Sequence, residues 1–297
     1  MKLELRHLAA FYVLAQELHF GRAAARLHLS PPPLSKHIKQ LEEIAGVALF
    51  TRTTRAVKLT PAGAIMHAEL QEIFNRLEGM LRSVRDASQS NGGRLAIGLT
   101  PTAASTPVIG ALLKYRTLHP DVQLDLQEMN SVEMEDALKL LRIDVALMRP
   151  CAVSPDVVLT TVHKEPICAA MRKESALLYG TISADQLLDH PLIAYEKKVS
   201  PYFGSLIERM FSNAGKKPAY IQESRLPTIL TLVEAGVGIA LVPASIIKTR
   251  QNILVGVPLD NTTSVMAELA IARLKTNQNA LVQNFIGTLL TYSGFVE

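Results

Sequence analysis

Residues 20–60 read FGRAAARLHLSPPPLSKHIKQLEEIAGVALFTRTTRAVKLT, and this stretch decides the fold of the N-terminal part of the chain. Its pattern predicts two short helices joined by a tight link and followed by a basic hairpin. Such a pair of helices, with the second placed to enter the major groove of DNA, is the helix-turn-helix arrangement. With the hairpin as its wing, the stretch therefore predicts a winged helix-turn-helix that binds double-stranded DNA.

The second helix of this motif has clear start signals. Ser30 is expected to cap it, and Pro31 suits the first helical position, where a missing N–H costs no hydrogen bond. Leu34, Ile38 and Leu41 form its expected inward stripe. Candidate DNA contacts lie off this stripe or in the hairpin: Ser35, Lys36, Lys39, Arg52, Arg55 and Lys58. For each of these side chains, contact with a base and contact with phosphate remain alternatives. For the hairpin, a solvated basic turn is the further alternative.

The basic charge of the chain is concentrated in the same segment. Residues 1–60 hold nine Lys or Arg and four Glu, a net charge of +5, whereas the whole chain has a formal charge of +4. The remaining residues therefore sum to −1. Binding to phosphate is favoured by release of counterions from DNA, which requires such a local excess. Many solvated surfaces reach +5, so the charge supports DNA binding only together with the motif.

Residues 61–88 are predicted to form one long helix. Its apolar side chains recur every three or four positions, as at the seam of a coiled coil: Met66, Leu70, Ile73, Leu77, Met80 and Val84. The spacing favours a dimerisation helix. Packing within the chain is the alternative, because Phe74 and Leu81 widen the stripe. The polar run DASQSNGG at 86–93 marks a domain boundary.

After Gly93, apolar strand-like runs alternate with helical patterns, which predicts an α/β class with parallel sheets. The predicted strands lie at 94–100, 122–128, 145–148, 167–171, 191–196, 239–243 and 268–272. A segment of this length is large for one such unit, so two lobes with a cleft between them are expected. The predicted domains are a winged helix-turn-helix at 1–60, a linker helix at 61–89 and a ligand-binding domain at 90–297. Within that domain, lobe I is expected at about 90–164 and 270–297, and lobe II at about 165–269.

Folds of this class bind ligands where strand ends meet helix starts. That rule selects Thr100, Thr102, Asn130, Ser131 and Arg149 as candidates. Hydroxyls, helix N-terminal N–H groups and a guanidinium suit a carboxylate. The alternatives are that Thr102 and Ser131 only cap helices, and that Arg149 pairs with an internal acid.

Two further side chains have two interpretations each. Phe203 either closes the pocket or lies in the core, and Arg225 faces either ligand or solvent.

Composition and motif content narrow the remaining classes. The two cysteines, Cys151 and Cys168, suit a reducing cytoplasm. Neither a secretory signal nor an apolar run of about 18 residues is present, so a cytoplasmic protein without a membrane partner is expected. No metal-ligand spacing, nucleophile elbow or phosphate loop occurs, so we expect neither an enzyme nor a cofactor. A solute-binding module or a carboxylate-binding enzyme on the same α/β lobes is the alternative.

Taken together, the chain resembles a LysR-type transcriptional regulator over nearly its whole length. The motifs that carry the resemblance are LRHLAAFYVLAQELHFGRAAARLHLS (5–30), PPLSKHIKQLEE (32–43), RTTRAVKLTPAG (52–63), ALKLLRIDVALMR (137–149) and GIALVPAS (238–245). RIDVALMR and VSPYF resemble the branch that senses aromatic compounds and their ring-cleavage acids.

The resemblance implies a two-lobe domain like periplasmic solute-binding proteins. It also implies a homotetramer, built as a dimer of homodimers. RNA polymerase is a further candidate partner. Promoter binding would be altered by a small carboxylate effector, an aromatic or dicarboxylic acid.

The resemblance also implies roles for particular residues. The start of the recognition helix falls on Pro32, Ser35 and Lys36, and the wing arginines on Arg52 and Arg55. In the aromatic-sensing branch, the effector-binding residues match Thr102, Ser131, Arg149 and Phe203. One departure stands out: the family usually has Gln where this chain has Pro31. A Gln side chain can hydrogen-bond a base edge and Pro cannot, so readout of one base pair is expected to be relaxed or shifted.

Overall fold

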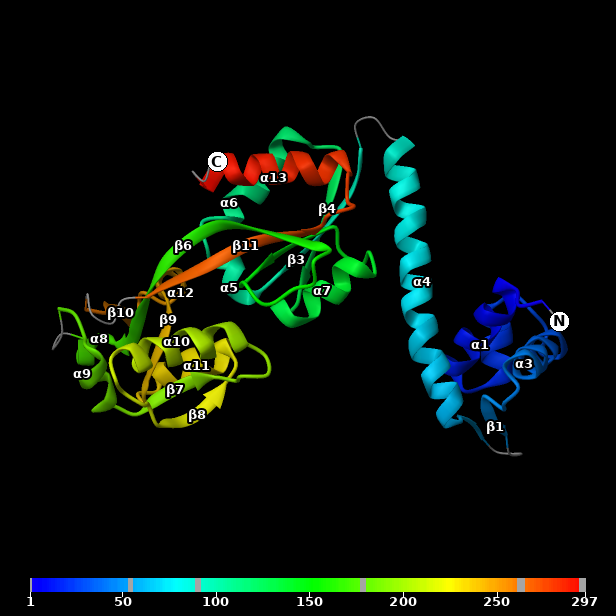
Figure 1. Cartoon of the computed structure of the whole chain (residues 1–297), viewed down its shortest axis with the longest axis horizontal. Helices are drawn as coiled ribbons and strands as arrows, with labels where there is room; N and C mark the ends of the chain where they lie inside the picture. The colour runs from blue at the N-terminus through cyan, green and yellow to red at the C-terminus, as the bar shows by residue number, and fades with distance from the viewer. Residues whose placement is uncertain (1, 53–55, 89–91, 177–179, 261–264, 294–297) are drawn as a thin grey trace. The chain divides into compact units, whose positions relative to one another are not determined.

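The computed structural model describes residues 2–52, 56–88, 92–176, 180–260 and 265–293. The chain divides into two compact units, Met1–Leu81 and Arg82–Glu297. The first unit contains three helices, a two-stranded hairpin and most of a long helix (Figure 1). These elements are α1 (Leu5–Glu17), α2 (Phe20–Arg26), α3 (Pro31–Ala45), β1 (Phe50–Arg52), β2 (Val57–Leu59) and α4 (Pro61–Ser88).

Helix α3 is the predicted recognition helix, and its ends are as the sequence indicates. Ser30 precedes it with an extended backbone, although its side chain makes no capping hydrogen bond. Gly46 ends it in the left-handed region at φ 71°, where glycine lacks the Cβ that penalises other residues. Leu34, Ile38 and Leu41 are all buried in the core of the first unit, together with Phe11 and Leu14 of α1. The winged helix-turn-helix prediction is confirmed.

Helix α4 divides the predicted apolar seam into two parts. Near its start, Leu70 is 3% exposed and Met66 packs against the same core as α3. Further along, Ile73, Met80 and Val84 are 49%, 47% and 63% exposed. The first part of the seam therefore belongs to the chain's own core, whereas the second part leaves apolar surface in contact with solvent.

The second unit is built on a mixed nine-stranded sheet with the strand order β4-β3-β5-β11-β6-β9-β7-β8, and β10 pairs with β6 off this path. The strands are β3 (Gly93–Leu99), β4 (Val122–Glu128), β5 (Val145–Met148), β6 (Val157–Arg172), β7 (Leu192–Tyr195), β8 (Tyr220–Ser224), β9 (Ile239–Pro243), β10 (Leu254–Pro258) and β11 (Met266–Leu274). The helices are α5 (Pro101–Ala104), α6 (Ile109–Leu118), α7 (Ser131–Lys139), α8 (Lys173–Ala176), α9 (Ala184–Leu188), α10 (Pro201–Asn213), α11 (Leu226–Glu234), α12 (Ala244–Lys248) and α13 (Ala280–Ser293).

The expected parallel pairing is correct for three strands of each lobe and wrong for the pairs that involve β6 and β11. In lobe I, β3 is parallel to β4 and β5; in lobe II, β7 is parallel to β8 and β9. The pairs that β6 forms with β9, β10 and β11 are antiparallel, as is β11 with β5. The reason is that one long strand, β6, leaves lobe I and enters lobe II, and β11 returns beside it.

Strands β6 and β11 run side by side between the two lobes, where Figure 1 shows them in green and orange. Their register shifts at Leu269/Ala270. A bulge of this kind bends a pair of strands, so it suits a connection between lobes. It lies close to the predicted lobe division, and the exact domain limits stay a prediction. Each lobe has its own apolar core around its own strands.

Candidate functional site

The start of α3 presents the predicted DNA contacts on one side of the helix. Pro32, Lys36 and Lys39 are exposed, and Ser35 is half-buried. The Lys39 ammonium lies 3.8 Å from Glu43, an exposed ion pair of small energy. These side chains therefore remain accessible to a nucleic acid.

Arg52 on the wing is held by the head of the protein (residues 1–60). Its Nη2 donates to Glu42 Oε2 at 2.8 Å, and its guanidinium lies 5.3 Å from the ring centre of Phe20. The other oxygen of Glu42 accepts the N–H groups of Leu49 and Phe50 at 2.9 and 3.1 Å. Arg52 thus braces the hairpin against α3 while its side chain stays 39% exposed. The other predicted wing arginine, Arg55, lies outside the described residues.

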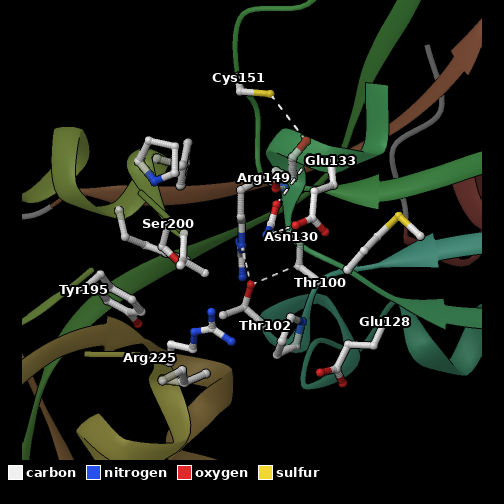
Figure 2. Close-up of a pocket in the computed structure, with 18 of the residues that line it drawn as sticks. Thr100, Thr102, Glu128, Asn130, Glu133, Arg149, Cys151, Tyr195, Ser200 and Arg225 are labelled. Carbon is white, nitrogen blue, oxygen red and sulfur yellow. Dashed lines mark hydrogen bonds between the residues drawn. The ribbon is translucent and has the colours of Figure 1, made fainter. Parts of the chain in front are cut away.

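A cavity of about 480 Å³ lies between the lobes of the second unit (Figure 2). Lobe I contributes residues that directly follow β3, β4 and β5, and lobe II contributes the starts of α10 and α11. All five predicted effector residues are among those that line it: Thr100, Thr102, Ser131, Arg149 and Phe203. The structure therefore brings together side chains that are up to about a hundred positions apart in sequence.

Arg149 is the centre of the lobe I wall, and it is 2% exposed. Its Nε donates to Thr102 Oγ1 at 3.1 Å, its Nη1 to the Glu268 carbonyl at 3.0 Å and its Nη2 to Glu165 Oε1 at 3.3 Å. Its backbone N–H donates to Ser131 Oγ at 3.1 Å. An internal acid is therefore present, and Arg149 is a paired cation rather than a free one.

Glu165, the partner of Arg149, is itself buried on β6. Its Oε2 accepts the Ser245 N–H at 2.8 Å, at the start of α12 in lobe II. Burial lowers the pKa of Arg149, and the neighbouring Glu165 carboxylate opposes that change. Removing one member of a buried pair leaves the other charge without compensation, which is costly. Because Glu165 also accepts the Ser245 N–H of lobe II, the Arg149–Glu165 pair connects lobe I to lobe II.

The helix caps beside this pair are Thr100 and Asn130, not Thr102 and Ser131. Thr100 Oγ1 accepts the Ala103 N–H at 3.2 Å, and Asn130 Oδ1 accepts the N–H of the third residue of α7 at 3.2 Å. The interpretation of Thr102 and Ser131 as simple caps is wrong. Their hydroxyls are instead joined to Arg149 and face the cavity.

Two stacked rings form the lobe II wall. Phe203 and Tyr195 have ring centres 4.6 Å apart with an interplanar angle of 19°. The Arg149 guanidinium carbon lies 5.1 Å from the Phe203 ring centre, a cation–π contact across the cleft. Phe203 is 2% exposed and belongs to the lobe II core. Both interpretations of Phe203 are therefore met, since it is a core residue that also lines the cavity.

Arg225 lines the mouth of the cavity on the lobe II side. Its side chain is 71% exposed, and its Nε is 3.8 Å from Glu196. It faces both ligand space and solvent. Arg225 and Ser200 precede α11 and α10, and neither side chain makes a capping hydrogen bond.

Sequence reasoning missed several residues of the site, among them Glu165, Tyr195 and Cys151. Tyr195 is the last residue of β7 and meets the same strand-end rule that selected Arg149. Glu165 has no such signal, because it lies inside a strand and acquires its role only through its contact with Arg149.

Within the described part of the chain, no three His, Cys, Asp or Glu side chains form a group that could hold a metal ion. Burial raises the pKa of Cys168 to about 12, so that thiol stays protonated at neutral pH. Across the same residues, no helix combines the length and apolarity that a bilayer crossing requires.

Two family models match the chain in succession. The model described as bacterial regulatory helix-turn-helix protein, lysR family, matches residues 5–64. The model described as LysR substrate binding domain matches residues 88–293.

Individual relatives match the chain over nearly its full length. AlsR of Bacillus subtilis, an HTH-type transcriptional regulator, is 32% identical, with 96% of this chain and 94% of the relative covered. CatR of Pseudomonas putida, another HTH-type regulator, is 30% identical, with 95% and 96% covered. The crystal structure of full-length CbnR complexed with its target DNA superposes with a TM-score of 0.80. It covers 98% of this chain and 100% of CbnR, and at 23% identity it shows a common fold.

Proposed function

This chain belongs to the LysR family of DNA-binding transcriptional regulators, and we propose that a carboxylic acid in the interlobe cavity alters its promoter binding. One observation carries the proposal. The same chain contains an exposed start of the recognition helix and a cavity between the lobes. The cavity wall combines hydroxyls and a helix start from lobe I with aromatic rings from lobe II. A device for holding DNA and a device for sensing a small molecule are thus parts of one polypeptide.

On the DNA side, we assign the contacts to Pro32, Ser35, Lys36 and Lys39 at the start of α3, with Arg52 and Arg55 on the wing. Lysine and arginine side chains there neutralise phosphate, whereas Ser35 has the reach for a base edge. CbnR, which shares the fold, is crystallised with its target DNA. Pro31 offers no side-chain donor or acceptor, so the base pair opposite it is read weakly.

Pairing of two chains follows from the exposed part of α4. Ile73, Met80 and Val84 recur at helical spacing, and their exposure leaves apolar surface that a second copy of α4 would cover. Two heads then meet two half-sites, and a roughly palindromic operator is expected. The working form is a homodimer or a homotetramer, and RNA polymerase is its partner at the promoter.

On the effector side, the acid lies with one carboxylate at the start of α7. Ser131 is the first residue of that helix, and helix N-termini favour anions because their N–H groups and dipole face the ligand. The Thr100 and Thr102 hydroxyls lie beside it. Arg149 acts through its ion pair with Glu165 and not as a free cation. The fitting ligands are aromatic or dicarboxylic acids.

Effector control is a population shift between two arrangements of the lobes. An acid that binds both arrangements equally changes nothing, so its contacts must differ between them. The protein is proposed to act in the cytoplasm, without a resident cofactor and without turning its ligand over. Chromatography of the acid after prolonged incubation with the protein tests the last point.

The direct test is a gel shift with the chain's own promoter region against random duplex of equal length, with and without benzoate and adipate. We expect a preference for the promoter fragment and a change in its affinity or footprint with one acid. Equal affinity for both duplexes, whatever acid is present, would contradict the function.

A further inference from the structure

The Tyr195 hydroxyl is a buried donor without a partner. Tyr195 is 3% exposed, and its Oη makes no hydrogen bond within the described part of the chain. Leaving a buried hydroxyl without a partner destabilises the fold, so folded proteins rarely keep one without a reason. Burial also raises the pKa of this phenol, so it remains a protonated donor at any physiological pH.

The location of this donor points to a ligand. Tyr195 lines the interlobe cavity from the lobe II side, and Figure 2 shows its hydroxyl directed toward the space beside Arg225. Its ring is fixed by the stack on Phe203, so the hydroxyl is held in place. The neighbouring Tyr202 differs, because its Oη already accepts the Glu268 N–H at 2.7 Å. Of these two phenols on the same wall, Tyr202 is hydrogen-bonded to the backbone, whereas Tyr195 has no partner among the described residues.

Lobe I and lobe II therefore offer complementary groups to one molecule. Ser131 and the start of α7 suit a carboxylate, whereas Tyr195 on the opposite wall suits an oxygen acceptor. We propose that Tyr195 recognises the effector from lobe II, donating a hydrogen bond to an oxygen at the end remote from the carboxylate. This inference rests on the proposed function and specifies the effector: an acid that carries a second oxygen.

The charge of the cavity wall decides which kind of oxygen fits. Glu128 and Glu133 line the wall and are exposed. The two arginines that line it, Arg149 and Arg225, each have an acid nearby, at 3.3 Å and 3.8 Å. A second full negative charge would be repelled by this wall. The remote oxygen is therefore an uncharged hydroxyl or carbonyl, and among the acids of the proposed function this favours a hydroxy acid or an oxo acid over a dicarboxylic acid.

The test uses matched acids that differ by one oxygen: benzoate with 4-hydroxybenzoate, and hexanoate with 6-hydroxyhexanoate. Binding is measured by titration calorimetry on the full-length wild type and on Tyr195→Phe. We expect the wild type to prefer the hydroxy acid of at least one pair, and Tyr195→Phe to lose that preference, about fivefold to tenfold for one hydrogen bond. Affinity for the parent acid should not change.

Two controls separate recognition from structure. Without ligand, Tyr195→Phe should melt at the wild-type temperature or above it, because it removes an unsatisfied hydroxyl. A clear fall in melting temperature would assign the hydroxyl to the fold and overturn the inference. Tyr220→Phe changes a lobe II tyrosine that does not line the cavity, and its affinities should match the wild type.

The remaining outcomes are distinct. If both members of a pair bind equally, or if Tyr195→Phe weakens both equally, the inference fails and the proposed function stands. If terephthalate binds better than 4-hydroxybenzoate, the prediction that the remote oxygen is uncharged is wrong. If none of these acids binds and promoter affinity ignores them all, the proposed effector class fails together with the inference.

Discussion

The head and the cavity hold their candidate residues in opposite ways. On α3, Lys36 and Lys39 are exposed, and the ion pair of Lys39 with Glu43 is weak. In the cavity, Thr102, Ser131 and Arg149 are buried, and both hydroxyls accept hydrogen bonds from Arg149. Exposed charges act on DNA separately, whereas a bonded network responds as a unit. Substitutions in the head should therefore weaken binding by independent steps, and substitutions in the cavity should act together.

The largest effect is expected from Arg149→Met. The variant leaves Glu165 as a buried charge without its partner, which costs roughly 3–5 kcal/mol of unfolding free energy. Effector response should be lost because the Thr102 hydroxyl loses the guanidinium that places it. Urea unfolding and an acid-dependent gel shift measure the two effects.

The double variant Arg149→Met/Glu165→Gln is the matched control. It removes both charges, so it should recover much of the lost stability while the acid response stays absent. If the double variant is as unstable as Arg149→Met alone, the pair is not the origin of the effect. Promoter binding without acid should persist in both variants.

Lys36→Ala tests whether an exposed lysine of the head contacts DNA phosphate independently of its neighbours. Losing one phosphate contact should flatten the slope of log affinity against log salt by about 0.9 and leave the melting temperature unchanged. Lys114→Ala removes the same charge from the exposed surface of α6 and should leave the slope as it is. An unaltered slope for Lys36→Ala would remove this lysine from the DNA interface.

Arg52→Ala tests a residue that is both a candidate DNA contact and part of an ion pair within the fold. Its ion pair with Glu42 is partly exposed, so its loss should cost the head roughly 0.2–1 kcal/mol. Operator affinity should fall as well, because the wing loses a cation. Glu42→Gln separates the two roles, since it breaks the brace and keeps the cation. Both variants should therefore lower the melting temperature measured by circular dichroism, but only Arg52→Ala should weaken operator binding in a gel shift.

The smallest effect is a pH dependence of the head. Burial, and then the neighbouring His7 and Arg6, lower the pKa of His37 below its ordinary 6.5. The unfolded chain then takes up this proton at a higher pH than the folded chain. Stability from this group is present above about pH 6.5 and falls as the pH drops through the folded pKa. Between pH 7.5 and 5, the melting temperature of the wild type should fall further than that of His37→Gln, which has no titrating group at this position.

Much of the fold could be read from local signals. Proline and serine at the start of α3 and glycine at its end fix the limits of that helix, and apolar spacing predicted both α4 and most strands. The first part of β6, together with β8 and β10, was missed. Of these, β8 is mostly exposed and β10 interrupts its apolar residues with glycine, so neither shows an apolar run. The strand-end rule predicted Thr100, Thr102, Ser131 and Arg149, because parallel strands bring their carboxyl ends to one edge.

The sequence by itself determined the family, the order of the domains and the edge at which a ligand would lie, since helix ends, apolar periods and strand ends are local features. Only the tertiary structure decided how Arg149 is used and that the Tyr195 hydroxyl has no partner among the described residues. Both depend on contacts between residues far apart along the chain, at the meeting of two lobes. Which donors remain free for a ligand depends on which of them already bind other residues of the folded chain.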